Sequence, residues 1–123
     1  MIRVLILEEH ALVREALEKR LRAMEGLDVV HSTGCYTDAV RCAQDKQPDV
    51  VLMEIKTSAG MKALQALRKA LPQSAIIVLT SYPDSREEAE VLRMGAHAYL
   101  LKSLDTTELV TYIQKSANAV SLS

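Results

Sequence analysis

The sequence predicts an α/β fold, in which helices cover both faces of a parallel sheet. Five short apolar runs typical of strands alternate with longer stretches in which apolar residues recur at helical spacing. Strands and helices that alternate in this way favour a parallel sheet with helices packed against it. With 123 residues, 49% of them hydrophobic, the chain has the size and composition of one domain with one core.

The first quarter of the chain predicts a strand, a helix and a second strand. The apolar run over residues 2–7 is the first strand, and residues 12–21 show the helical spacing. Gly26 ends that helical region. The short β-branched pair at residues 29–30 marks the second strand.

The middle of the chain repeats the pattern. Either Thr37 or Asp38 is suited to cap the second helix, and Pro48 ends it. Residues 49–53 form the third strand, and leucines within residues 64–71 predict the third helix.

Two further strands and two helices complete the fold. Residues 75–79 and 98–101 are the fourth and fifth strands, and the fourth helix between them begins at an N-cap, Asp84, and ends at Gly95. The last helix carries three side chains that we expect in the core, namely Leu109, Tyr112 and Ile113.

Polar side chains close four of the five apolar runs. Glu8 and Glu9 follow the first strand, and Glu54 follows the third. Thr80 closes the fourth run and Lys102 follows the fifth. Because the carboxyl ends of parallel strands meet at one edge of a sheet, where ligands bind, we expect a charged pocket centred on Glu54.

Composition excludes several classes of protein. A net charge of −1 gives no general attraction to nucleic acid or to anionic membranes. No apolar stretch approaches the roughly 18 residues of a membrane span, and the N-terminus carries no basic leader. Cys35 and Cys42 are too few for a disulfide framework and suit reduced thiols. We therefore expect a cytoplasmic protein that contacts neither nucleic acid nor membrane through this domain.

Four segments resemble the receiver domain of two-component response regulators, and the match extends from about residue 1 to about residue 116. They are the acidic pair Glu8-Glu9, PDVVLMEI at 48–55, VLTS at 78–81 and GAHAYLLK at 95–102. The last segment, together with His10, is most similar to receivers fused to a LuxR-type helix-turn-helix domain. The resemblance implies a CheY-like (βα)5 sandwich with strand order 2-1-3-4-5. It also implies a receiver domain over residues 1–118, with 119–123 as a frayed tail or the start of a linker to a DNA-binding domain.

In that family an aspartate at the end of the third strand accepts a phosphoryl group, and the aspartate and the acidic pair hold Mg²⁺. The resemblance implies the following roles: Glu54 in the phosphoacceptor position, Glu8, Glu9 and Glu54 as metal ligands, Lys102 as counter-ion, and Thr80 and Tyr99 as switch residues. Tyr99 is either a core aromatic with its hydroxyl at the rim of the pocket or a ring that rotates during switching.

Glu54 departs from the family because glutamate is one methylene longer than aspartate. Its oxygens reach roughly 1.5 Å further, and a displacement near ~1 Å can slow a positioned reaction ~100-fold. Three long carboxylates also fit the octahedral geometry of Mg²⁺ poorly. We expect weak Mg²⁺ binding or none, and no other cofactor.

The leading hypothesis is an atypical, non-enzymatic receiver that controls transcription through protein contacts and without phosphorylation. Glu54 either mimics the phosphorylated state, with hydrogen bonds from Lys102 and Thr80, or belongs to an inert site on a docking scaffold. The alternatives are a phospho-accepting receiver, a metal-dependent phosphatase and a flavodoxin-like cofactor binder, although Glu8-Glu9 would repel a cofactor phosphate. The expected partners are a second copy of the chain and a histidine kinase. The second copy would use the face of the fourth helix, fifth strand and fifth helix, or that of the first and fifth helices.

Overall fold

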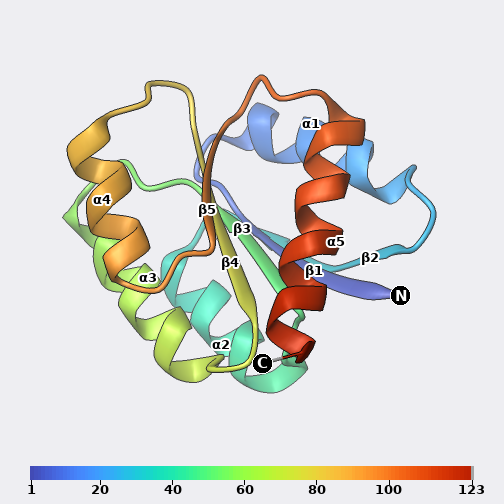
Figure 1. Ribbon diagram of the computed structural model, residues 1–123, viewed down its shortest axis with the longest axis horizontal. Helices are drawn as coiled ribbons and strands as arrows, with labels where there is room; N and C mark the ends of the chain where they lie inside the picture. Colours follow the sequence, from blue (N-terminus) through green and yellow to red (C-terminus); the bar gives the residue numbers. More distant parts are fainter. Residues whose placement is uncertain (123) are drawn as a thin grey trace.

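The computed structural model describes the backbone of residues 1–122 and the side chains of residues 1–119. Five parallel strands form one sheet in the order β2-β1-β3-β4-β5, with helices packed on both faces (Figure 1). This confirms the predicted α/β class and the predicted strand order.

The bounds of the elements follow the predicted alternation along the chain. The strands are β1 (Ile2–Leu7), β2 (Leu27–Thr33), β3 (Val50–Met53), β4 (Ala75–Thr80) and β5 (Ala98–Leu101). The helices are α1 (Ala11–Arg22), α2 (Tyr36–Lys46), α3 (Ser58–Ala70), α4 (Ser85–Arg93) and α5 (Thr106–Leu122). The predicted end of the domain at residue 118 falls within α5, and Ser123 lies outside the described residues. Within the part of the chain that is described, no helix combines the length and apolarity that a membrane span needs.

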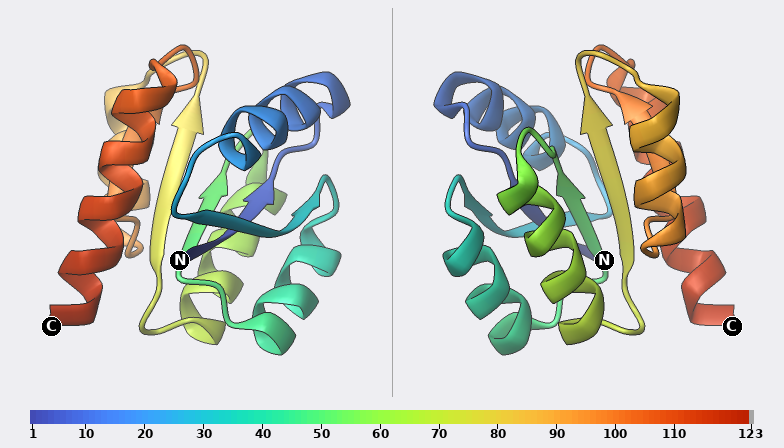
Figure 2. Two further views of the ribbon diagram at one scale, coloured as in Figure 1. Left: turned by 90° about the vertical axis from the view of Figure 1, so that its right-hand side faces the viewer. Right: turned by 90° about the vertical axis from the view of Figure 1, so that its left-hand side faces the viewer.

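The core consists of two apolar layers, one on each face of the sheet (Figures 1 and 2). Side chains alternate along a strand, so Leu5 and Leu7 of β1 face one layer while Val4 and Ile6 face the other. Helices α2, α3 and α4 complete the first layer, and α1 and α5 complete the second. Both sides of the central strands are therefore buried, and only their ends remain available to build a site.

Helix capping agrees with the prediction in α4 and corrects it in α2. Asp84 caps α4, because its carboxylate accepts the backbone N–H groups of Arg86 at 2.8 Å and Glu87 at 3.3 Å. The prediction of Thr37 or Asp38 as the cap of α2 is wrong. The helix begins at Tyr36 after an extended Cys35, which makes no side-chain capping bond to the helix.

Two further corrections concern the extent of β2 and the side chains of α5. Strand β2 spans Leu27–Thr33 rather than residues 29–30, because it pairs with β1 from Leu27 to Thr33, with one irregularity at Val30. Leu109 and Ile113 are buried as predicted, but Tyr112 is 43% exposed. Tyr112 lies three residues after one core position and one residue before the other, so the helical turn carries it to the rim of the apolar face.

The two cysteines are expected to react at very different rates with iodoacetamide. Cys35 is exposed, and a hydrogen bond with the Thr37 hydroxyl at 3.1 Å and the Asp38 N–H lower the pKa of its thiol. Cys42 is buried, and burial raises the pKa of its thiol. We expect Cys35 to be alkylated at least ~10-fold faster in the folded protein. Peptide mass spectrometry over time, with urea-unfolded protein as the control, would contradict this if both thiols reacted at one rate.

Candidate functional site

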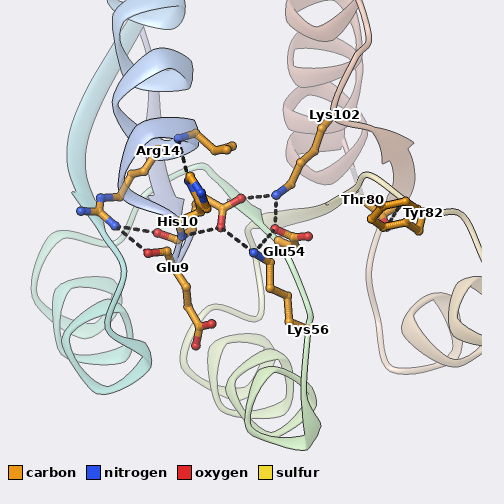
Figure 3. Close-up of polar contacts among 10 residues, drawn as sticks. Glu9, His10, Arg14, Glu54, Lys56, Thr80, Tyr82 and Lys102 are labelled. Carbon is orange, nitrogen blue, oxygen red and sulfur yellow. Dashed lines mark hydrogen bonds and ion pairs between the residues drawn. The ribbon is translucent and has the colours of Figure 1, made fainter.

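Glu8, Glu54 and Lys102 lie close together because the sheet register aligns the ends of the strands that carry them. Strands β1 and β3 are paired up to Leu7 and Met53, the residues directly before the two glutamates. Lys102 directly follows β5 at the same edge of the sheet. The predicted convergence of these three residues is therefore present (Figure 3).

The Lys102 ammonium bridges the two glutamates. Its Nζ donates to Oε1 of Glu8 and to Oε2 of Glu54. The exposed fractions of the three side chains are 15% for Lys102, 4% for Glu8 and 11% for Glu54. Buried charges of this kind depend on one another, because an unpaired charge in such a place carries the full cost of lost hydration.

Lys56 is a fourth member of this group, which the sequence interpretation did not identify. Its Nζ lies 3.6 Å from Oε2 of Glu54 and 4.0 Å from Oε2 of Glu8 (Figure 3). Lys56 follows Glu54 by two residues, and in extended backbone such residues point to the same side. That spacing was the available signal. We call Glu8, Glu54, Lys56 and Lys102 the charged cluster.

Glu9 does not join the charged cluster. Its side chain is exposed, and its carboxylate points away from Glu8 and Glu54 (Figure 3). Glu9 lies in the bend that follows β1, and there its side chain is directed outward. Among the described residues no three acidic, histidine or cysteine side chains are placed to hold a metal ion. Glu8 and Glu54 come together without Glu9, so the residues present do not fit the three-carboxylate set that the resemblance implies for Mg²⁺.

The two glutamates of the charged cluster differ in acidity. Burial and the adjacent Glu8 carboxyl raise the pKa of Glu54, which Lys102 only partly offsets. Burial also acts to raise the pKa of Glu8. Hydrogen bonds from Glu54, from Lys102 and from the His10 N–H outweigh this effect of burial, so the pKa of Glu8 is lowered. The His10 N–H donates to Oε2 of Glu8 at 3.0 Å. When the pair takes up a proton, that proton resides on Glu54.

Thr80 shares a cavity with Glu54 but does not bond to it. Thr80, Glu54, Lys56 and Lys102 all line a cavity of about 420 Å³. The buried Thr80 hydroxyl accepts the backbone N–H of Tyr82 at 3.1 Å. The hydroxyl therefore stabilises the turn after β4, as hydroxyls at strand ends often do.

Tyr99 lies between the core and the first turn of α4. Its ring packs against the apolar layer beneath α4, and its hydroxyl donates to Oε1 of Glu87 at 2.8 Å. The same oxygen accepts the N–H of Asp84 at 3.2 Å. This arrangement matches the first predicted alternative, a core aromatic with its hydroxyl at the rim.

The fold and the site together define a class of protein. The family profile of the response regulator receiver domain matches residues 4–114. The chain belongs to this family, as the sequence motifs predicted.

The similar proteins are response regulators, and a LuxR-family regulator is among the similar solved structures. Response regulator GacA of Pseudomonas aeruginosa is 32% identical over 117 residues, which cover 94% of this chain and 55% of GacA. Response regulator UvrY of Escherichia coli is 35% identical over 117 residues, which cover 93% of this chain and 53% of UvrY. The chain thus spans about half the length of these relatives. The crystal structure of a LuxR-family two-component response regulator from an Aurantimonas species has a TM-score of 0.86 at 25% identity and covers 95% of this chain and 85% of that one.

Proposed function

We propose that this domain is an atypical receiver of a cytoplasmic two-component regulator of transcription, and that it acts through protein contacts without phosphorylation of Glu54. Membership of the receiver family and the regulators among its relatives support the general role. The observation that carries the atypical part is the bridge from Lys102 to both Glu8 and Glu54.

The charged cluster disfavours attack by Glu54 on a phosphoryl group. Oε2 of Glu54 already accepts from Lys102 and lies 3.6 Å from the Lys56 ammonium. Burial and the adjacent Glu8 carboxyl raise the pKa of Glu54. Phosphoryl transfer depends on in-line positioning, and the longer stem of glutamate displaces the oxygens by roughly 1.5 Å.

The contacts of Thr80 favour an inert scaffold over a mimic of the phosphorylated state. The mimic hypothesis requires that Glu54 accept hydrogen bonds from both Lys102 and Thr80. Lys102 makes its contact, whereas the described hydrogen bond of the Thr80 hydroxyl is one that it accepts from the Tyr82 N–H, and none joins it to Glu54. The Tyr99 hydroxyl donates to Glu87, a residue that lines the same cavity as Glu54 and Thr80, and does not reach Glu54.

Exposed apolar side chains support contact with a second copy through the face of α4, β5 and α5. Leu92 of α4, Leu101 of β5 and Tyr112 of α5 are 44%, 44% and 43% exposed. A second copy packed on this face would cover one large apolar side chain on each of the three elements. Leu12 of α1 is also exposed, and it lies outside α4, β5 and α5.

Treatment with acetyl phosphate and Mg²⁺ is expected to leave the intact mass of the protein unchanged. A receiver with aspartate at the equivalent position, treated in parallel, shows that the reagent is active. A phosphoryl adduct that forms on the native chain and disappears in Glu54→Gln would contradict the proposal. Glu54→Gln removes the nucleophile and keeps the length of the side chain, so it isolates the chemistry at this one residue.

A further inference from the structure

We infer that Lys56 takes the place of the divalent cation at this site, so that the protein's own ammonium group excludes a metal ion from Glu8 and Glu54. The inference deepens the proposed function and rests on it. The receiver family implies a metal ion at this site, but Glu8, Glu9 and Glu54 of this chain are not placed to hold one together.

The oxygens that a metal would need are already occupied. Three of the four carboxylate oxygens of Glu8 and Glu54 face a nitrogen of the chain. Oε1 of Glu8 and Oε2 of Glu54 contact Lys102. Oε2 of Glu8 accepts the N–H of His10 at 3.0 Å and lies 4.0 Å from Lys56. Glu9, the third acid of the family's set, points elsewhere (Figure 3).

The charges of the cluster sum to zero without a metal. Two carboxylates face two ammonium groups, so a divalent cation would add two positive charges to a neutral group. An ammonium is a compact point charge with three donors, and it can neutralise oxygens without the strict octahedral shell that Mg²⁺ requires. A metal ion could bind only if one lysine withdrew.

Lys56 is the lysine that decides this competition. It is 40% exposed and lies 3.6 Å and 4.0 Å from the two glutamates, so it is the ammonium that an incoming metal ion would have to displace. Lys102 is 15% exposed and bonds both glutamates directly. Removing Lys56 leaves two carboxylates with one positive charge, which restores a net attraction for cations.

Mn²⁺ binding to the full chain, measured by the loss of the electron paramagnetic resonance signal of the free ion, tests the inference. We expect Lys56→Ala to bind Mn²⁺ at least ~10-fold more tightly than the native chain, and Mg²⁺ to compete for the same site. Lys56→Arg keeps the positive charge and should bind as weakly as the native chain. Lys62→Ala removes the same charge from an exposed position on α3 and is the matched control.

Each outcome decides the inference. A gain in Lys56→Ala alone supports it. Equal binding by the native chain and Lys56→Ala, whether tight or undetectable, overturns it, as does an equal gain in Lys62→Ala. The phosphoryl-adduct measurement is separate, so native protein that binds Mn²⁺ as tightly as Lys56→Ala yet forms no adduct would refute this inference and leave the proposed function standing.

Discussion

Replacing Lys102 by methionine is expected to lower the free energy of unfolding by about 3 kcal/mol at neutral pH. The substitution keeps most of the apolar stem and removes the ammonium that bridges Glu8 and Glu54. Two buried carboxylates then face each other with only the partly exposed Lys56 as counter-ion. Urea unfolding followed by circular dichroism measures the loss.

The loss of unfolding free energy caused by Lys102→Met should become smaller at acidic pH. A carboxyl with a raised folded-state pKa, such as Glu54, destabilises the fold once pH exceeds that pKa, and the penalty disappears as pH falls toward the ordinary value of 4.5. Glu8 has a lowered pKa, so its stabilising contribution persists above 4.5 and is lost only below it. Without Lys102 the penalty on Glu54 grows. The gap between native and variant proteins should therefore be widest at neutral pH and narrow as Glu54 takes up its proton.

Two controls keep this prediction specific to the bridge. Lys56→Met removes the more exposed ammonium and should cost less than about 1 kcal/mol. A triple variant in which Glu8→Gln and Glu54→Gln accompany Lys102→Met has no carboxylates left to repel each other, and most of the lost stability should return. A pH-independent deficit, or no recovery in the triple variant, would show that packing of the Lys102 stem matters more than its charge.

Replacing Arg68 by methionine is expected to cost a similar amount, about 3 kcal/mol, for a different reason. The half-buried guanidinium donates to three backbone carbonyls, those of Leu71, Ser74 and Gly95. These carbonyls belong to the end of α3, the loop before β4 and the loop before β5. Each would lose its donor in a place that water reaches poorly. Urea unfolding of the variant measures the effect.

Arg93 is the matched control for Arg68. It lies on α4, is 69% exposed and pairs with Glu90 at 3.0 Å on the surface. Arg93→Met should change the free energy of unfolding by less than about 1 kcal/mol. Coincident unfolding curves for Arg68→Met and Arg93→Met would refute the role assigned to Arg68.

The fold and the meeting of Glu8, Glu54 and Lys102 could be predicted from the sequence, because both depend on where apolar runs end. The runs before Glu8, Glu54 and Lys102 are buried strands, and parallel strands bring their ends to one edge. The meeting of these three charges could therefore be predicted without knowing any contact.

The direction of individual side chains beyond a strand end was harder to predict. Glu9 points outward and Lys56 points inward, and both lie beyond the last paired residue of their strand. The spacing of Glu54 and Lys56 was a signal, but sequence alone does not say how far the extended conformation continues past β3, so the spacing did not settle the direction of Lys56. The start of α2 after Cys35 escaped prediction because cysteine is not among the residue types preferred as N-caps.

Strand β5 lies at the edge of the sheet, and Lys102, which contacts Glu8 and Glu54, directly follows it. It is hydrogen-bonded only to β4, and border strands with partners on one side open more readily than central ones. When β5 detaches, Lys102 leaves with it and uncovers negative charge at the ends of β1 and β3. Amide hydrogen exchange in β5 therefore reports on the protonation of acids that lie on two other strands.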